Sequence, residues 1–389
     1  PAQRGAQALC MAQLRDDAGG SGGGGGLTAR LLDVVRNVGL VRGLSDGSAL
    51  ATGLRRAVDK PALIGAYLRP QRAVLDVTYG AAAEQRLDVV PRRSDAAAGA
   101  RPVVLFFHGG AWGSGTKLFY RNFARRLSDE VDATVAVVGY PVYPTATAWG
   151  QVSSVALATR WARSPAGRAV LGAADVDAGV LLCGHSSGAH ITSLSAIWAA
   201  EDVANAGFGD RDEDGDEAPG LKHMIHAATE VTVEERLAVL PDGFVGLAGV
   251  YDIRKHYAFE TSRGVADVSP MKPACGGSPK LFDAMSPAQE VERMSDAAAA
   301  RMPKVLLVHG DSDEIVPYSS TNGMAEALAS ARERAGAVAA SDASFIIEDV
   351  GHAEVVTEIA FEEDETPSVD KVFPLVRRFV DEFLAEQTR

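Results

Sequence analysis

Short apolar runs alternate with longer amphipathic stretches from about residue 72 to the end of the chain. The apolar runs, bounded by Gly, Pro or Asp, predict strands at Ala73–Tyr79, Arg86–Val90, Val103–Phe107, Thr134–Val138, Gly179–Cys183, Phe244–Gly249, Lys304–His309 and Phe345–Asp349. The amphipathic stretches predict helices at Lys117–Ser128, Gln151–Arg163, Ser187–Ala200, Ser319–Ala335 and Asp370–Glu386. Apolar strands separated by helices predict an α/β fold, with a mostly parallel eight-stranded sheet flanked by helices. The first two strands have no helix between them and predict a hairpin.

Residues 1–71 do not follow this alternation. The tract Gly19–Gly26 predicts a flexible, glycine-rich leader, and Leu27–Leu68 predicts an N-terminal helical segment with an apolar stripe. Packing of this stripe against the main domain is the favoured interpretation. Because arginines flank it, a helix lying on a membrane surface is the alternative. Residues 72–389 are predicted to form the main domain.

Two segments interrupt the alternation within that domain. The acidic run Asp210–Glu217 predicts a solvated loop near residues 205–220. Residues 251–301 follow the sixth strand and contain several Pro and Gly residues. A long segment between two strands is where a lid or a pocket wall is expected, so we predict a lid-like insertion there.

Composition narrows the class of protein. Hydrophobic residues make up 47% of the 389 residues and charged residues 23%, which is enough for a large core. The net charge of −13 argues against a nucleic-acid partner, which would require basic clusters. Three cysteines give no disulfide framework, and no apolar run is long enough to span a bilayer. Because the chain begins at Pro1, membrane anchoring is left open.

The strand Val103–Phe107 runs directly into His108-Gly109-Gly110-Ala111-Trp112. Glycines at the end of a strand present backbone N–H groups that no side chain shields. Such groups can hold an oxygen that becomes negative during acyl transfer, so Gly109 and Gly110 are candidate oxyanion donors. Trp112, which the glycine geometry does not require, is a candidate wall of a substrate pocket.

The pattern Gly-x-Ser-x-Gly, which can carry a nucleophile, occurs three times and its context separates the matches. Ser21 lies in the glycine tract, and Ser45 has no strand before it. Ser186 follows a predicted strand and opens a predicted helix, as a nucleophile elbow requires. Ser186 is therefore the candidate nucleophile, with the N–H of Ser187 as a third oxyanion donor.

A serine hydroxyl becomes a nucleophile when an imidazole takes its proton, and the chain has eight histidines. His352 follows the last predicted strand, at the carboxyl end where loops carry catalytic groups, and it is the candidate base. His309 is interpreted as a turn-stabilising residue, and the side chain of His185 is expected to point away from the attack site. His190 lies one helical turn beyond Ser186 and is interpreted as a packed or pocket-lining residue.

The acid that orients the base is expected after the strand that precedes the last one. Asp311, Asp313 and Glu314 all follow that strand. Asp313 is favoured because Val316-Pro317 ends its loop, while Asp311 is better suited to stabilising the turn. Asp252, which follows the sixth strand, is the alternative acid.

The order Ser186, Asp313, His352 is the order in which the α/β-hydrolase plan presents its catalytic residues. Together with the backbone donors, it predicts serine-mediated acyl transfer. This chemistry requires no metal and no organic cofactor, and the histidines and acids lack the spacing of a zinc site.

At these residues the chain resembles the α/β-hydrolase superfamily over residues 72–389. His108–Trp112 and Gly184-His185-Ser186-Ser187-Gly188-Ala189-His190 are similar to the carboxylesterase branch that includes isoprenylcysteine methylesterases and kynurenine formamidases. Lys117 and the pairing of Ser186 with His190 favour the methylesterase-like group. The resemblance implies a catalytic domain that hydrolyses a carboxylic ester, including the methyl ester of a lipidated cysteine. It leaves cytoplasmic and endomembrane-associated locations in the cell open.

Two other functions remain as alternatives. An arylformamidase would use the same three side chains on an amide. A binding protein on the same fold would use none of them catalytically, and the complete set Ser186, Asp313 and His352 argues against it. The oligomeric state is not predicted.

Overall fold

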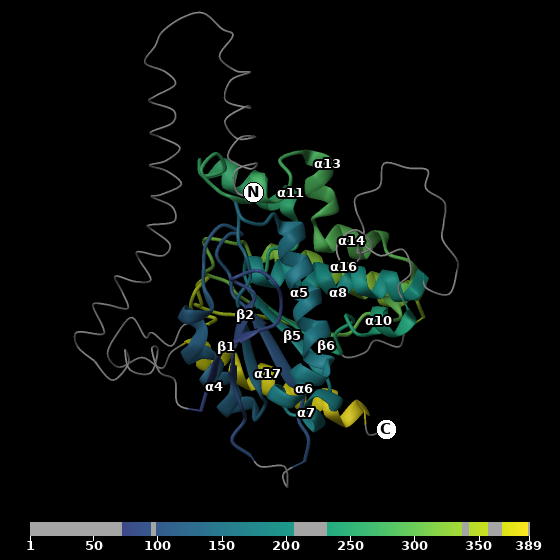
Figure 1. The fold of residues 1–389 in the computed structure, drawn as a ribbon. Helices are drawn as coiled ribbons and strands as arrows, with labels where there is room; N and C mark the ends of the chain where they lie inside the picture. The colour runs from purple at the N-terminus through teal and green to yellow at the C-terminus, as the bar shows by residue number, and fades with distance from the viewer. Residues whose placement is uncertain (1–71, 95–98, 206–231, 337–341, 357–367, 388–389) are drawn as a thin grey trace, which may run out of the picture.

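The computed structural model describes residues 72–94, 99–205, 232–336, 342–356 and 368–387 (Figure 1). The predicted glycine-rich leader, the helical segment Leu27–Leu68, the alternative serines Ser21 and Ser45, and the acidic run Asp210–Glu217 all lie outside these ranges. The division of the chain at residue 72 therefore stays a prediction.

Eight strands form one sheet, in the order β1-β2-β4-β3-β5-β6-β7-β8. Their bounds are β1 Val74–Thr78, β2 Arg86–Val90, β3 Val103–Phe107, β4 Val135–Val138, β5 Val180–His185, β6 Gly243–Leu247, β7 Lys304–Gly310 and β8 Ala343–Ile347. Strand β2 pairs antiparallel with both β1 and β4, and every other pair in the sheet is parallel. The predicted fold class and the initial hairpin are confirmed.

Helices cover both faces of the sheet because successive side chains of a strand point to opposite sides. In β3, Leu105 and Phe107 join the core beneath helices α5, α8 and α16, and Val104 and Phe106 join the core beneath α4 and α17 (Figure 1). These helices span α4 Arg121–Val131, α5 Ala148–Arg163, α8 Ser187–Asn205, α16 Ser319–Arg334 and α17 Phe373–Gln387. All four of these β3 side chains are 2% exposed or less, so the sheet is buried on both faces.

Two short 3-10 helices, η3 Lys117–Tyr120 and η4 Ser368–Lys371, lie at the starts of the predicted helices Lys117–Ser128 and Asp370–Glu386. The sequence pattern missed the other short helices, which are α6 Pro165–Leu171, α7 Ala173–Asp177, α10 Val233–Leu237, α11 Ile253–Ser262, α12 Met271–Ala274, α13 Pro279–Ala284, α14 Pro287–Arg293 and α15 Asp296–Ala299. Local signals define several of them: Ser164 and Ser278 each cap a helix that has proline at its first position. The predicted insertion at residues 251–301 contains α11 to α15, and its role as a lid stays a prediction.

The parallel register brings the carboxyl ends of the central strands to one edge of the sheet. Phe107 at the end of β3 pairs with Gly184 of β5, and His185 pairs with Leu247 of β6. On the other side, His309 of β7 pairs with Ile346 of β8. The loops that follow β3, β5, β7 and β8 therefore lie next to one another, and these loops carry the predicted site residues.

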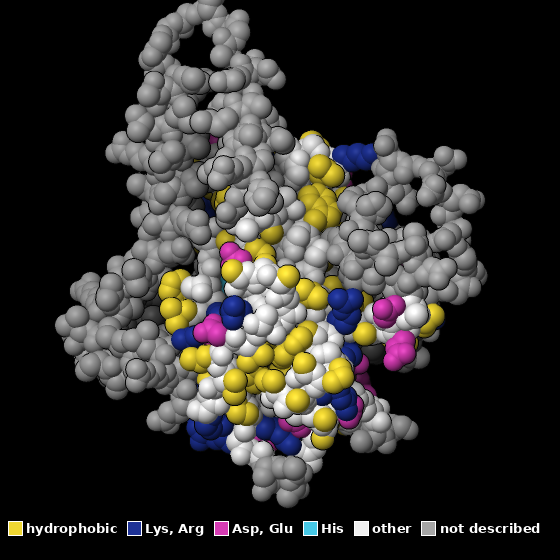
Figure 2. Space-filling model, viewed as in Figure 1, with side chains coloured by type: hydrophobic (Ala, Val, Ile, Leu, Met, Phe, Trp, Pro, Cys, Tyr) yellow, Lys and Arg dark blue, Asp and Glu magenta, His cyan; other side chains and the backbone are white. Residues whose placement is uncertain are grey.

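The surface carries charges of both signs. On the face drawn in Figure 2, Lys and Arg side chains lie close to Asp and Glu side chains, with hydrophobic side chains between them. Ion pairs such as Arg163–Asp242 and Arg168–Asp177 join opposite charges at 2.7 and 2.6 Å. Within the described ranges, no helix has both the length and the apolar character needed to cross a bilayer.

Candidate active site

Ser186 lies in a strained turn between β5 and α8. Its backbone φ is +55°, a conformation that costs a non-glycine residue about 1–3 kcal/mol. A hydrogen bond to the neighbouring strand holds the turn, because the Ser186 N–H donates to the carbonyl of Leu247 in β6 at 2.9 Å. It also needs glycine after the serine, since a Cβ on Gly188 would lie 2.3 Å from the carbonyl oxygen of Phe107. The tight turn presents the Ser186 hydroxyl at the start of α8.

Ser186, His352 and Asp313 form a continuous chain of hydrogen bonds. The Oγ of Ser186 lies 2.9 Å from Nε2 of His352, and Nδ1 of His352 lies 2.7 Å from Oδ2 of Asp313. An ionised carboxylate only accepts hydrogen bonds, so Nδ1 carries the proton and Nε2 is free to accept the serine proton. The three residues that the sequence selected as nucleophile, base and acid are thus brought together in space.

Asp313 is held as a carboxylate. Its Oδ1 accepts backbone N–H groups from Ile315 and Val316, each at 2.8 Å. Burial acts to raise the pKa of the Asp313 carboxyl, but hydrogen bonds from His309 and His352 outweigh it and hold this pKa well below its usual range. Asp313 is therefore ionised at neutral pH and can stabilise a positive charge on His352.

The competing acids have other partners. Asp252 caps helix α11 through the N–H of Lys255, and Asp311 accepts from the N–H of Asp349 and from the Ser312 hydroxyl. Glu314 is exposed. Only Asp313, among these candidates in the described part of the chain, makes a hydrogen bond with His352.

The three expected oxyanion donors are not equivalent. The N–H of Gly109 donates to the hydroxyl of Tyr120 at 3.2 Å, so the expectation that Gly109 offers a free donor is not met. Among the described residues, nothing accepts a hydrogen bond from the N–H of Gly110 or of Ser187. Gly110 adopts φ +142°, a conformation that L side chains rarely adopt.

Tyr120 and His185 connect the loop after β3 to the loop that carries His352. The Tyr120 hydroxyl lies 3.1 Å from Nδ1 of His185, and Nε2 of His185 lies 3.0 Å from the His352 carbonyl oxygen. The carbonyl can only accept, so Nε2 donates and Nδ1 accepts from Tyr120. Burial lowers the pKa of His185 to about 3, which keeps this ring neutral.

The prediction that the His185 side chain points away from the site was wrong, because its ring contacts the ring of His352 with centroids 4.9 Å apart. Tyr120 carried no sequence signal.

Trp112 and His190 are buried together beneath the loop after β3. They are 1% and 0% exposed, and Trp112 Nε1 donates to His190 Nδ1 at 3.0 Å. His190 Nε2 donates to the carbonyl of Met285 in the insertion at 2.7 Å. Burial lowers the pKa of His190 to about 4, so the ring stays neutral and Nδ1 stays an acceptor. Their side chains therefore support the loop from the interior rather than offering an exposed surface to a substrate.

Lys117, which the sequence associated with one group of esterases, is engaged with the hairpin. Its ammonium pairs with Asp76 at 2.6 Å and with Asp88, and Asp88 also pairs with Arg121 at 2.7 Å. The Asp88 side chain is 2% exposed. Lys117 thus neutralises a buried carboxylate and fixes η3 to strands β1 and β2.

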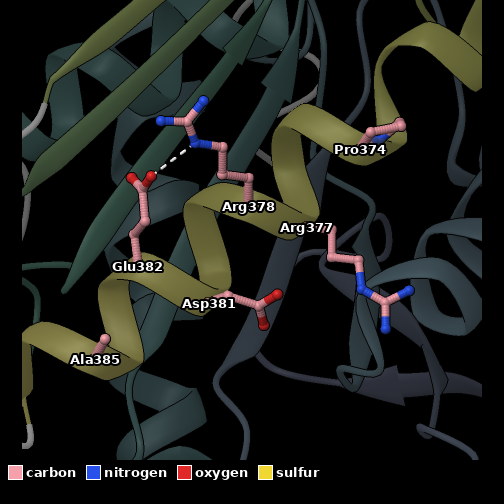
Figure 3. Close-up of a pocket in the computed structure, with 6 residues that line it drawn as sticks. All are labelled: Pro374, Arg377, Arg378, Asp381, Glu382 and Ala385. Atoms are coloured by element: carbon pink, nitrogen blue, oxygen red, sulfur yellow. Dashed lines mark hydrogen bonds and ion pairs between the residues drawn. The ribbon is translucent and has the colours of Figure 1, made fainter.

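A groove of about 470 Å³ lies elsewhere, on the outer side of α17. Its lining is Pro374, Arg377, Arg378, Asp381, Glu382 and Ala385 (Figure 3). Arg378 and Glu382 pair with each other at 2.7 Å across one helical turn. None of these residues belongs to the loops that carry Ser186, Asp313 and His352.

Comparisons with known proteins concern the family and the fold of the chain. A family model described as BD-FAE matches residues 87–328, more than half of the chain. A probable isoprenylcysteine alpha-carbonyl methylesterase of Oryza sativa subsp. japonica is 26% identical over 275 residues, which cover 70% of this chain and 58% of the relative. The chain therefore aligns with less than two thirds of that relative. A kynurenine formamidase of Danio rerio is 34% identical over 136 residues, covering 34% of this chain and 42% of the relative.

Solved structures show the same fold. The crystal structure of esterase B from Lactobacillus rhamnosis superposes with a TM-score of 0.55 at 18% identity, covering 88% of this chain and 97% of that chain. At this identity the likeness concerns the fold. The resemblance of the motifs to α/β-hydrolases is confirmed, and the chain belongs to the BD-FAE family.

Proposed function

We propose that this protein is a serine carboxylic-ester hydrolase whose catalytic residues are Ser186, His352 and Asp313. The observation that carries the proposal is the unbroken chain from Ser186 Oγ through the His352 ring to Asp313 Oδ2, at 2.9 and 2.7 Å. Esterases among the relatives and structural neighbours support an ester as the substrate.

The first half of the reaction acylates the serine. His352 Nε2 takes the proton of the Ser186 hydroxyl while Oγ attacks the ester carbonyl carbon. The carbonyl oxygen becomes negative and is held by the N–H groups of Gly110 and Ser187. His352 then gives its proton to the departing alkoxide, the C–O bond breaks, and the alcohol leaves.

The second half repeats these steps with water. His352 takes a proton from the water as its oxygen attacks the acyl-enzyme, and then returns a proton to Ser186 Oγ as the carboxylic acid is released. Asp313 stays ionised and stabilises the positive charge that His352 carries in both halves.

For the substrate, we propose the methyl ester of an isoprenylated cysteine, which the name of the rice relative supports. The zebrafish relative supports N-formylkynurenine, an aryl formamide, as the alternative. Rates measured on a methyl-ester panel and on N-formylkynurenine separate the two. Faster turnover of the formamide than of every ester would replace the esterase proposal by formamidase activity.

The mechanism is tested with a p-nitrophenyl ester and a fluorophosphonate probe. The wild-type protein turns over the ester and is labelled, and Ser186→Ala loses the label and about 10⁵-fold or more in kcat. Ser195→Ala is the matched control, because its hydroxyl lies in the same helix, buried and without a partner among the described residues. If Ser186→Ala keeps wild-type turnover, or if the wild type shows neither turnover nor label, the proposed mechanism is wrong.

A further inference from the structure

A second imidazole contacts the same oxygen of Asp313 that His352 uses. His309, near the end of β7, places Nε2 at 3.0 Å from Asp313 Oδ2, while His352 Nδ1 lies 2.7 Å from that oxygen. The His309 side chain is fully buried. Its interpretation as a turn-stabilising residue is therefore incomplete, because its ring reaches the carboxylate of the candidate site.

The partners of His309 determine where its proton lies. Besides Asp313, Nε2 faces the carbonyl oxygen of Val316 at 2.9 Å. A carboxylate and a carbonyl both accept hydrogen bonds, so Nε2 must carry the hydrogen and donate it to them. On the opposite side of the ring, Nδ1 lies 2.7 Å from the hydroxyl of Thr321, which is itself fully buried. The ring is thus held at both nitrogens, with a donor directed at Asp313.

Asp313 consequently has its hydrogen-bonding positions filled by fixed groups. Two backbone N–H groups bind Oδ1, and two imidazoles share Oδ2. Only the His352 ring among these four groups exchanges a proton in the proposed reaction. The other three define the plane of the carboxylate, and His309 is the one that acts on the oxygen facing His352.

We propose that His309 is a positioning residue, whose Nε2–H holds Oδ2 of Asp313 toward Nδ1 of His352 and shares the negative charge of that oxygen. This inference rests on the proposed esterase function. Without His309, the carboxylate would be held only through Oδ1 and by His352 itself, and the full charge of Oδ2 would act on His352 alone. His352 would then be less well oriented toward Ser186 and would hold its proton more strongly.

The test compares two substitutions at the same position. His309→Leu removes the donor, and we expect kcat on the p-nitrophenyl ester to fall roughly 100-fold, as for a misplaced catalytic group, with KM unchanged. His309→Gln keeps an N–H near the position of Nε2, so we expect it to recover most of the lost kcat. Equal losses in the two variants would overturn the proposal, because they would indicate packing rather than a hydrogen bond. So would His309→Leu with wild-type kcat.

The pH profile provides a readout that a packing role would not move. We expect the acid limb of kcat/KM in His309→Leu to move to higher pH, because Asp313 then stabilises the protonated form of His352 more strongly. Among the described residues, His185 and Asp313 interact with His309 and His352: burial lowers the pKa of His185 to about 3, and hydrogen bonds hold the pKa of Asp313 well below its usual range. Neither titrates near neutral pH. An acid limb that stays in place would contradict the proposal.

Two further measurements separate the ways in which the test can fail. Thr321→Val leaves His309 in place but frees its ring to turn, so kcat should fall at unchanged KM. If His309→Leu does not fold, Thr321→Val and His309→Gln provide the test. Wild-type kcat in Thr321→Val overturns the proposal. Ser186→Ala is measured alongside. If Ser186→Ala is active, the esterase mechanism itself fails, whereas an inactive Ser186→Ala with a fully active His309→Leu refutes only the role of His309.

Discussion

The buried hydrogen bond between Trp112 and His190 gives a prediction whose size follows from its geometry. His190→Leu leaves two interior groups without partners, the Trp112 indole N–H at 3.0 Å and the Met285 carbonyl at 2.7 Å. Each orphaned group costs about 1–3 kcal/mol, so we expect the free energy of unfolding to fall by roughly 2–6 kcal/mol. Trp112→Phe removes the indole donor and leaves His190 Nδ1 without a donor instead.

The two substitutions should not be additive. In the double variant the indole N–H and the imidazole Nδ1 are both absent, so neither is left orphaned. Only the Met285 carbonyl then lacks its partner, so we expect the double variant to be more stable than the sum of the single losses implies, by about 2–6 kcal/mol for the two groups that are absent. Urea unfolding followed by far-ultraviolet circular dichroism measures all four proteins, with Ser195→Ala as a control for substitution within α8.

The same bond should matter for activity. Ala111 and Trp112 adopt φ values of +49° and +61°, a strained conformation that persists only where the surroundings impose it. Loss of the His190 acceptor lets this loop relax and displaces the N–H of Gly110, so we expect kcat to fall roughly 100- to 1000-fold, as for loss of one oxyanion donor. Additive stabilities within about 0.5 kcal/mol, together with unchanged kcat, would refute the reasoning.

Three other predictions follow from close contacts and buried charges. Gly188→Ala should lower kcat roughly 100-fold, because its Cβ would meet backbone oxygens at 2.3 and 2.5 Å and displace Ser186. Gly323→Ala is the control, because a Cβ at Gly323 would meet no atom within 4 Å. Equal activities of the two variants would contradict the expectation. Lys117→Met leaves the buried Asp88 with less charge compensation and should cost about 3 kcal/mol in urea unfolding, whereas a loss under about 1 kcal/mol would refute that role. Stability should fall as the pH drops from 6.5 toward 4, by about 1.4 kcal/mol per pH unit for each buried neutral histidine, since the unfolded chain takes up protons that the folded protein does not. A flat stability between pH 7 and 5 would contradict this for the histidines concerned, His108, His185 and His190.

Much of the fold was predictable because its signals are local. Each predicted strand overlaps an observed one, since an apolar run bounded by turn residues is read from adjacent positions. The nucleophile turn was equally readable, because Gly184, Ser186 and Gly188 lie within five consecutive residues between a strand and a helix. The short helices of residues 251–301 were not predicted, since helices of four to ten residues are too short to show a clear periodicity.

The partners of the site residues could not be predicted, because they come from distant parts of the chain. Trp112 and His190 are 78 positions apart, and His185 and His352 are 167 apart. The sequence alone identified a strand ending in glycines, a serine elbow, and an acid and a histidine in the order of an acyl-transfer enzyme. Only the tertiary structure showed that Tyr120 occupies the N–H of Gly109, that Trp112 and His190 support the loop from inside, and that His309 shares the carboxylate of Asp313. The physical reason is that residue type and spacing define local backbone conformation, whereas the partner of a buried polar group depends on which strands the sheet brings side by side.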